Sequence, residues 1–501
     1  MSVSKNLVSN TFYLMLDWGL MAVLSFSFWI VIWKNLPPFQ VGIFSTAQNL
    51  IGLISTIAAA GFMSACTKLI PEYSETKKNG MINSLIRFVL VAISIISIAA
   101  SVLVFIFAPQ LSGLILDFPV DAMRLVSIGV ILFTFEITLG SILMGFQDMK
   151  KYLITDIIGT ACKLLLTVFL IFSGFQYVGP LLAFLIASLI ITILRFDRKW
   201  IMRTKMGIDK KFIFHEYSSP SIIASIGPIT YSNMPYIIVA FFGGLTVTGI
   251  FSTAIGITAQ LVVIMGVIVS AIFPVVSQLS VHNNMKNKQN TIINTAIKYG
   301  LLITLPIVLV LVLTPRAIVL LLSQKNYILA SDFFPLLSLS FLVMGLSNIF
   351  LSSLYAIGKT KVNRNIWILS SLIFFITSIP LTFYFSALGL SAAFLFSISL
   401  TFLISLFYLR KYLVFKLNWI NIMKILPAAL VFVAFIYFAD YFQLSVFLKY
   451  FIAAIGVLVY FIVLIPLKFF DKNDLRVLRI LSEQVPFLKN IFSLISKFIS
   501  K

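Results

Sequence analysis

Charged residues are scarce in this chain of 501 residues. Asp, Glu, Lys and Arg together make up 11% of the sequence, whereas hydrophobic residues make up 60%. Soluble globular domains carry about 25% charged residues, so the composition excludes a soluble protein of this length. It predicts an all-α integral membrane protein that crosses the bilayer many times.

Cysteine and histidine are also rare, with two residues of each. Cys66 and Cys162 lie in or near predicted spans, so neither a disulfide framework nor a metal cluster is expected. His215 and His282 lie in loops far apart in the sequence, and there is no Walker loop, acidic metal motif or nucleophile–base constellation. We therefore expect a protein that is not an enzyme and that uses no cofactor.

Long apolar runs are abundant instead. A helix that crosses a membrane needs about 20 mostly apolar residues, and the sequence contains fourteen such segments. The first is too long for the hydrophobic core of a signal peptide and is expected to stay in the protein. The predicted spans are residues 8–33, 41–64, 86–108, 122–145, 153–173, 177–195, 218–242, 247–272, 291–314, 333–356, 365–385, 388–409, 422–440 and 447–467.

Lys and Arg alternate between the loops that join these spans. Of the 37 basic residues, 31 lie on the side of the two termini, five lie on the other side and Lys163 lies within a span. Because basic residues accumulate in cytoplasmic loops, we expect both termini to be cytoplasmic and the protein to lie in the cell membrane. This distribution explains the net charge of +21 without a nucleic-acid partner.

One hexapeptide, Gly-Ile-Phe-Ser-Thr-Ala, occurs twice, at residues 42–47 and 249–254. The first copy opens span 2 and the second opens span 8, so both segments run in the same direction through the membrane. Internal repeats indicate duplicated units, and the even offset makes the two halves parallel rather than inverted. The sequence thus predicts two six-helix lobes and two extra C-terminal helices.

The predicted domains follow from this division. The C-terminal tail has apolar residues at helical spacing between basic ones, which is typical of a helix that lies on membrane lipids. A helix that binds a partner protein is the alternative. The boundaries are 1–195 for the N-lobe, 196–217 for a basic cytoplasmic linker, 218–410 for the C-lobe, 411–470 for spans 13 and 14, and 471–501 for the interfacial tail.

Four charged residues inside the predicted spans all belong to the N-lobe, namely Asp17, Glu136, Asp156 and Lys163. Charges inside a membrane are costly and mark functional sites. A buried carboxylate near a lysine can bind and release H⁺ or Na⁺, so Asp17, Glu136 and Asp156 are candidate ion-coupling residues. Lys163 is a candidate for binding an anionic headgroup. Two structural alternatives stay open: a Glu136–Lys163 ion pair that serves only architecture, and an Asp17 carboxylate bonded to a neighbouring helix.

Polar residues without charge are candidates for lining a substrate path. Gln48 and Asn49 lie in the N-lobe, and Asn233 and Gln260 lie in the C-lobe. Span 7 is interrupted by Gly227-Pro228, and such breaks in transporter helices often border the path. These four amides complete the predicted substrate-binding set.

Three short segments resemble the Wzx-like polysaccharide flippases, a branch of the multidrug/oligosaccharidyl-lipid/polysaccharide exporter superfamily. Residues 36–44 (LPPFQVGIF) are similar to that group's LGP-x-x-x-G-x-Y/F segment, and residues 68–73 (KLIPEY) are similar to its R-x-x-P-E-Y ending. Residues 145–151 (GFQDMKK) are similar to its G-x-x-x-x-K turn. The group often carries an acidic residue in span 7, where this chain has Asn233.

The resemblance implies that the protein moves a polyprenyl-linked oligosaccharide from the cytoplasmic to the outer leaflet by alternating access. An H⁺ or Na⁺ gradient would drive the movement, which belongs to cell-surface polysaccharide biosynthesis. Lys163 would attract the pyrophosphate, and Asp17 or Glu136 would couple transport to the ion. A basic, sugar-sized cavity favours this function. A cation-coupled multidrug exporter of the same superfamily predicts an acidic, aromatic cavity, and a non-transporting scaffold predicts a closed interface between the lobes.

Overall fold

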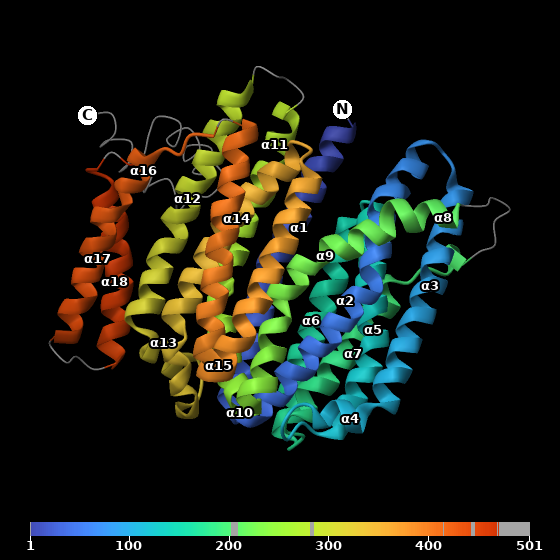
Figure 1. Ribbon diagram of the computed structural model, residues 1–501, viewed down its shortest axis with the longest axis horizontal. Helices are drawn as coiled ribbons and strands as arrows, with labels where there is room; N and C mark the ends of the chain where they lie inside the picture. Colours follow the sequence, from blue (N-terminus) through green and yellow to red (C-terminus); the bar gives the residue numbers. More distant parts are fainter. Residues whose placement is uncertain are drawn as a thin grey trace.

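The computed structural model describes residues 2–201, 209–280, 285–413, 415–441, 446–467 and 469. The predicted tail at 471–501 lies outside these residues, as does part of the predicted linker. Where the structure is described, the chain forms helices and no strand (Figure 1). Helix is the expected outcome, because a long apolar segment in a bilayer must satisfy its backbone N–H and C=O groups within itself.

Short connections join the helices. The first part of the chain forms α1 (Ser2–Asn35), α2 (Pro38–Glu75), α3 (Asn79–Ile106), α4 (Ala108–Gly113), α5 (Val120–Gly145), α6 (Met149–Phe172), α7 (Val178–Arg195), η1 (Arg198–Ile201), α8 (Lys210–Phe212), η2 (Ile213–Ser218) and α9 (Ser219–Ser232). The second part forms α10 (Met234–Thr258), α11 (Gln260–Ser280), α12 (Lys286–Leu313), α13 (Pro315–Leu322), η4 (Lys325–Asp332), α14 (Phe334–Ala356), α15 (Thr360–Leu413), α16 (Trp419–Met423), α17 (Ile425–Tyr441) and α18 (Val446–Leu464).

Two of the helices contain parts of two predicted spans. α10 breaks at Gly244, where φ is 80° and ψ is 171°. Its first part continues the span that α9 begins, and its second part continues into α11. α15 breaks at Ser386, where φ is 53° and ψ is −139°, between the predicted spans 365–385 and 388–409. Glycine adopts a positive φ without steric cost, which explains the residue at the first break.

Within the described part of the chain, ten helical stretches are long and apolar enough to cross a membrane by length and composition. Two of them, Met234–Ser280 and Thr360–Leu413, contain the breaks just described. Shorter apolar helices cover Ile425–Phe438 and Ile452–Leu464. The fourteen predicted spans map onto these elements together with α9, and the prediction of an all-α, multi-pass membrane protein is confirmed.

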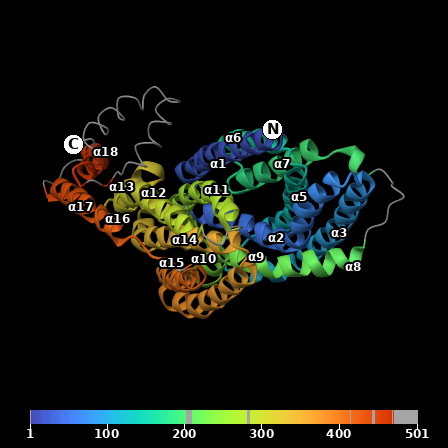
Figure 2. The same cartoon turned by 90° about the horizontal axis from the view of Figure 1, so that it is seen from above.

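The helices form two groups when the molecule is seen from above (Figure 2). α1–α7 lie on one side, α10–α15 lie on the other, and α17 and α18 stand at the outer edge beside α12. Helix contacts agree with this view, since α6 packs against α1 and α7, and α14 packs against α11 and α15. This arrangement is the predicted one of two lobes and two extra helices.

The two copies of the repeated hexapeptide pack against each other where α2 crosses α10. A Cβ atom on Gly42 would lie 1.8 Å from the backbone oxygen of Leu245, and one on Gly249 would lie 1.8 Å from the backbone oxygen of Pro38. Leu245 precedes Gly249 by the same four residues that separate Pro38 from Gly42. The contact is therefore symmetric, and each glycine lets the partner backbone approach closely. All residues of both hexapeptides are buried.

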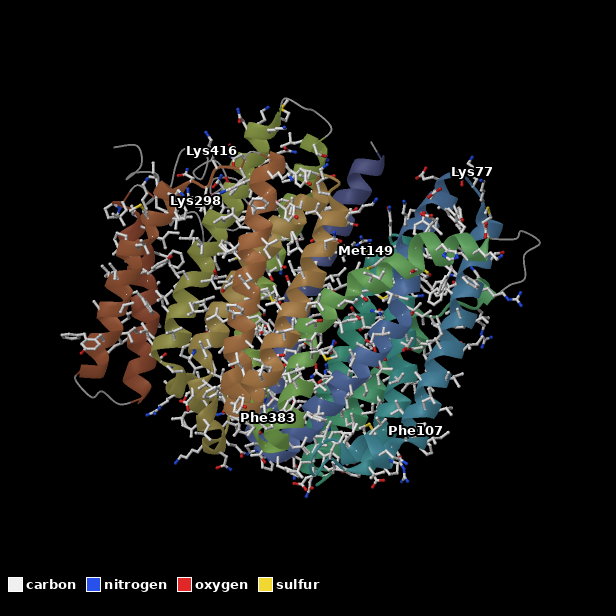
Figure 3. The ribbon with its side chains drawn as sticks, in the orientation of Figure 1. Lys77, Phe107, Met149, Lys298, Phe383 and Lys416 are labelled. Atoms are coloured by element: carbon white, nitrogen blue, oxygen red, sulfur yellow. The ribbon has the colours of Figure 1, made fainter. Side chains whose placement is uncertain are left out.

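The two ends of the helix bundle differ in charge. Lys77 and Lys416 lie at one end, which we call the basic face, and Phe383 lies at the other, the opposite face (Figure 3). On the opposite face the lobes are also joined by hydrogen bonds. The hydroxyl of the fully buried Tyr327, which follows α13, donates to the backbone oxygen of Leu36 at the end of α1, over 2.8 Å.

Candidate substrate cavity and buried charges

A cavity of about 910 Å³ lies between α1 of the N-lobe and α11, α14 and α15 of the C-lobe. We call it the central cavity. Its volume is in the range of about 300–1,000 Å³ that is typical of small-molecule sites. Most of its wall is apolar, and no lysine or arginine is among the described residues that line it. Its polar lining residues are Asp17, Ser25, Gln260, Ser270, Asn348, Ser352 and Asn363.

Asp17 is the acidic residue of this lining. Its side chain is 5% exposed, and its Oδ1 is buried without a hydrogen bond to any residue that the structure describes. The spacing of Asp17 and Ser25 predicts that they share one face of α1, and both residues line the central cavity. Trp18, beside Asp17, lines it as well. A buried polar atom without a partner demands a physical explanation, and ligand or ion binding is one.

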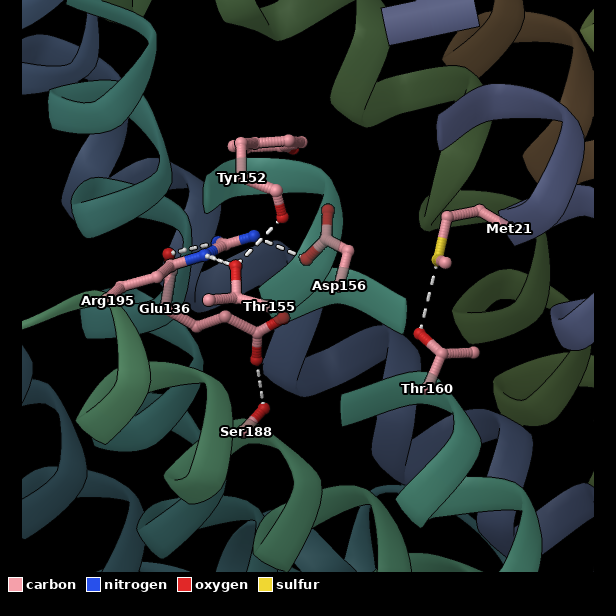
Figure 4. Close-up of polar contacts among 8 residues, drawn as sticks. All are labelled: Met21, Glu136, Tyr152, Thr155, Asp156, Thr160, Ser188 and Arg195. Atoms are coloured by element: carbon pink, nitrogen blue, oxygen red, sulfur yellow. Dashed lines mark hydrogen bonds and ion pairs between the residues drawn. The ribbon is translucent and has the colours of Figure 1, made fainter. Parts of the chain in front are cut away.

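Asp156 does not line the central cavity but forms an ion pair with Arg195 inside the N-lobe (Figure 4). Arg195 is the last residue of α7 and is 2% exposed. Its Nε donates to the Thr155 hydroxyl over 3.1 Å, and its Nη1 donates to the Glu136 backbone oxygen over 3.0 Å. The guanidinium also lies over the Tyr152 ring, 4.6 Å from its centroid.

The role of Arg195 is not evident from its position in the sequence, because a basic residue at the end of a span resembles the basic residues of the loops on the terminus side. The connection between α6 and α7 is short, so the two helices form an antiparallel hairpin. Asp156 precedes this connection by about as many residues as Arg195 follows it, which places both at the same depth. Equal distance from a tight hairpin connection was therefore the signal that could have identified the pair.

Glu136 and Lys163 share a small cavity of about 50 Å³ within the N-lobe. The Glu136 carboxylate accepts a hydrogen bond from the Ser188 hydroxyl (Figure 4). The Lys163 ammonium lies over the ring of Phe28 on α1, 4.4 Å from its centroid. No ion pair joins Glu136 to Lys163 among the described residues, although the cavity is large enough to hold water between them. Neither residue lines the central cavity.

The four predicted amides divide between different places. Gln260 lines the central cavity, and its Nε2 donates to the Gly256 backbone oxygen over 3.2 Å. Asn233 is not among the residues that line it. The Asn233 side chain lies against Gly52 of α2, and its Nδ2 donates to the Ser232 hydroxyl over 2.9 Å. It therefore belongs to a contact between α2 and the start of α10.

The two N-lobe amides lie on α2, away from the residues that line the central cavity. The Asn49 Nδ2 donates to the Ser45 backbone oxygen over 2.8 Å, within its own helix. The Gln48 Oε1 is buried without a hydrogen bond to a described residue. Of the predicted substrate-binding residues, the structure thus brings Gln260 to the cavity that also contains Asp17.

Two further amides of the central cavity, Asn348 and Asn363, were missed by sequence analysis. Asn348 lies in the second half of α14 and makes no hydrogen bond to a described residue, and the Oδ1 of Asn363 is buried without one. The position of Asn348, a polar amide inside a predicted span, was the sequence signal that could have indicated a cavity-lining role. Trp18 and Trp367 also line the cavity, and the sequence did not distinguish them from packing residues.

Comparison with known families identifies the chain. A family model described as polysaccharide biosynthesis protein matches residues 7–280. This match spans more than half of the sequence. The chain belongs to the polysaccharide biosynthesis protein family.

Individual relatives of this family member are distant in sequence and close in fold. An uncharacterized membrane protein of Methanocaldococcus jannaschii is 21% identical over 408 residues, which cover 76% of this chain and 80% of the relative. The lipid II flippase MurJ in an inward closed conformation has a TM-score of 0.73 and 19% identity, over 91% of this chain and 98% of that one. An inward-facing multidrug resistance MATE family transporter of the MOP superfamily has a TM-score of 0.64 and 16% identity, over 78% of this chain and 94% of that one.

The family match bears out the predicted resemblance to proteins of polysaccharide biosynthesis. The likenesses show that the chain shares its fold with a lipid II flippase and with a MATE family transporter of the MOP superfamily. At such identities the solved structures show the fold and leave the cargo open. The residues of the central cavity are therefore the basis for any further statement about function.

Proposed function

We propose that this family member flips a polyprenyl-linked oligosaccharide from the cytoplasmic to the outer leaflet by alternating access. The observation that carries the proposal is the central cavity between the lobes, whose polar lining is made of amides and serines with a single described carboxylate. Amides and hydroxyls both donate and accept hydrogen bonds. They therefore match the hydroxyl groups of a sugar and do not require a charged substrate.

The cavity also bears on the two alternatives. A scaffold predicts a closed interface between the lobes, which does not fit a cavity of about 910 Å³. A drug exporter for cations predicts an acidic, aromatic cavity, and Asp17 with Trp18 and Trp367 meets part of that description because cations bind to aromatic faces. One carboxylate among three amides and three serines favours the neutral, hydroxyl-rich substrate. The cation exporter remains the second candidate.

The arrangement of the lobes supports alternating access. The lobes touch on the opposite face through the Gly42–Gly249 crossing and through the bond from Tyr327 to Leu36. Asn363, near the start of α15, lines the central cavity toward the basic face. With the basic face in the cytoplasm, this is a state closed to the outside. We propose residues 1–195 and 218–410 as the two moving lobes, in the cell membrane with cytoplasmic termini.

The positions of the charged residues refine the proposed coupling mechanism. Asp17 has an unpartnered oxygen at the wall of the central cavity, so we assign it the binding of H⁺ or Na⁺. Asp156 is neutralised by Arg195 and takes an architectural role. Lys163 and Glu136 lie outside the central cavity, so in this state the pyrophosphate would not meet Lys163.

Loss of the gene tests the proposal. Cells that lack it should accumulate a lipid-linked oligosaccharide on the cytoplasmic leaflet, and the wild-type gene should reverse this. The location of the lipid is measured by its access to a glycosidase in sealed inverted vesicles and in intact cells. No accumulation together with new sensitivity to cationic dyes would refute the flippase and favour the drug exporter.

A further inference from the structure

A second cavity opens from the central cavity into the C-lobe. We call it the side chamber. It has a volume of about 420 Å³ and lies among α9, α10, α11, α14 and α15. Val262, Val263, Asn348 and Trp367 line both cavities, so they form the boundary through which the two spaces meet.

The side chamber lies deeper in the membrane than the central cavity. Along α14, which runs from the opposite face to the basic face, Phe341 and Met344 line the chamber and Leu351 and Ser352 line the central cavity. At a rise of about 1.5 Å per residue, Phe341 and Ser352 are about 16 Å apart along the helix. A group that enters from the basic face reaches the central cavity first and the chamber second.

The lining of the side chamber is aromatic and uncharged. Tyr231, Tyr236, Phe341 and Trp367 contribute rings, and no Asp, Glu, Lys, Arg or His is among the described residues that line it. The predicted interruption at Gly227-Pro228 is wrong, because α9 is continuous through these residues, and Gly227 packs closely on this wall, where a Cβ would lie 2.6 Å from the Cβ of Trp367. Aromatic rings can pack against the C–H face of a sugar ring, and a lining without charged residues suits a sugar that is neutral.

Two polar groups at the chamber have no partner within the protein. The Tyr236 hydroxyl and the Asn348 amide make no hydrogen bond to any residue that the structure describes, although both line the chamber. The other tyrosine differs, because the Tyr231 hydroxyl donates to the Ser370 backbone oxygen over 3.2 Å. Both residues line the chamber, so their polar groups are available to a ligand there.

The geometry points to the side chamber as the subsite for the leading sugar of the transported glycan, the ring farthest from the lipid. This inference rests on the proposed flippase function and adds to it a place for one sugar. The ring of Trp367 would stack on the sugar, and Tyr236 and Asn348 would form hydrogen bonds with its hydroxyls. The chamber then makes transport sensitive to the length of the glycan.

The test uses the full chain reconstituted in vesicles and two fluorescent polyprenyl pyrophosphates, one with a single sugar and one with several. Flipping is measured as the fraction of each lipid that a membrane-impermeant reductant can reach. Met344→Trp narrows the side chamber and should slow the several-sugar lipid by about tenfold, as expected for bulk in a binding pocket, while the one-sugar lipid is unaffected. Val269→Trp, in the central cavity, should slow both lipids.

A tyrosine pair tests the hydroxyl without added bulk. Tyr236→Phe should raise the half-saturating concentration of the several-sugar lipid by about fivefold, because it removes one hydrogen bond. Tyr231→Phe is the matched control, because the Tyr231 hydroxyl forms its hydrogen bond within the protein. Losing this hydroxyl should lower the thermal stability and leave the half-saturating concentration of the several-sugar lipid unchanged. If Met344→Trp does not fold, the comparison of Tyr236→Phe with Tyr231→Phe still tests whether the side chamber binds a sugar.

The outcomes separate the two proposals. If wild-type protein flips neither lipid, the flippase function fails and the subsite fails with it. If wild-type protein flips both lipids and Met344→Trp or Tyr236→Phe does not discriminate between them, the subsite alone is overturned. Loss of tetraphenylphosphonium transport in Met344→Trp with normal glycan flipping would also overturn it, and would make the chamber a cation site.

Discussion

Replacing Arg195 by methionine should destabilise the protein far more than replacing an exposed arginine. The buried guanidinium holds the Asp156 carboxylate in an ion pair and donates to the Thr155 hydroxyl and the Glu136 backbone oxygen. Removing one partner of a buried pair costs about 3–5 kcal/mol, because the other charge stays buried and unpaired. The loss is measured as the decrease in thermal stability of the purified protein in lipid nanodiscs.

A double variant separates the unpaired charge from lost packing. Arg195→Met combined with Asp156→Leu leaves no buried charge without a partner, so much of the stability should return. Arg124→Met is the matched control, because the Arg124–Asp121 pair has an N–O distance of 3.2 Å and side chains that are 51% and 83% exposed. Such a pair contributes about 0–1 kcal/mol. Equal losses from Arg195→Met and Arg124→Met would refute the reasoning.

Three further predictions follow from the lobe contacts and the cavity. Gly42→Ala should sharply lower the yield of folded protein, because its Cβ would lie 1.8 Å from a backbone oxygen of α10. Gly19→Ala is the control: a Cβ there has no atom within 4 Å, so this variant should express normally. Similar yields of the two variants would contradict the prediction. Tyr327→Phe loses its bond to Leu36, worth about 1 kcal/mol, so a cysteine placed in the central cavity should react faster with an impermeant thiol reagent from outside. An unchanged reaction rate would argue against a role of the Tyr327–Leu36 bond in closing the cavity to the outside. Asp17→Asn should fold normally and abolish the response of transport to an H⁺ or Na⁺ gradient. A retained response would show that Asp17 is not the ion-coupling residue.

The membrane architecture could be predicted well from the sequence because its signals are local. Each span is a continuous apolar run, so 177–195 could be predicted even though it is short, and α7 covers Val178–Arg195. The same locality explains the error at Arg195. A residue at the end of an apolar run looks exposed when that run is considered alone, and its pairing with Asp156 becomes visible when the neighbouring helix is considered with it.

The candidate site could be predicted less well, because residues that line a cavity come from helices far apart in the sequence. Asp17 and Gln260 belong to different lobes and line the same cavity. Lys163 was predicted to meet the substrate, but in this structure it faces the ring of Phe28 and shares a small cavity with Glu136. Helical periodicity indicates which residues share a face, whereas the packing of other helices decides what that face meets.

The repeated hexapeptide illustrates this difference. The sequence by itself determined that the chain contains two parallel halves, because a repeat and its place among the spans are properties of chain order. Only the tertiary structure decided that the two copies touch each other, with Gly42 against Leu245 and Gly249 against Pro38. Contact between segments about two hundred residues apart depends on how the lobes dock, and docking arises from the combined packing of many helices. The same docking creates the central cavity and thus the site.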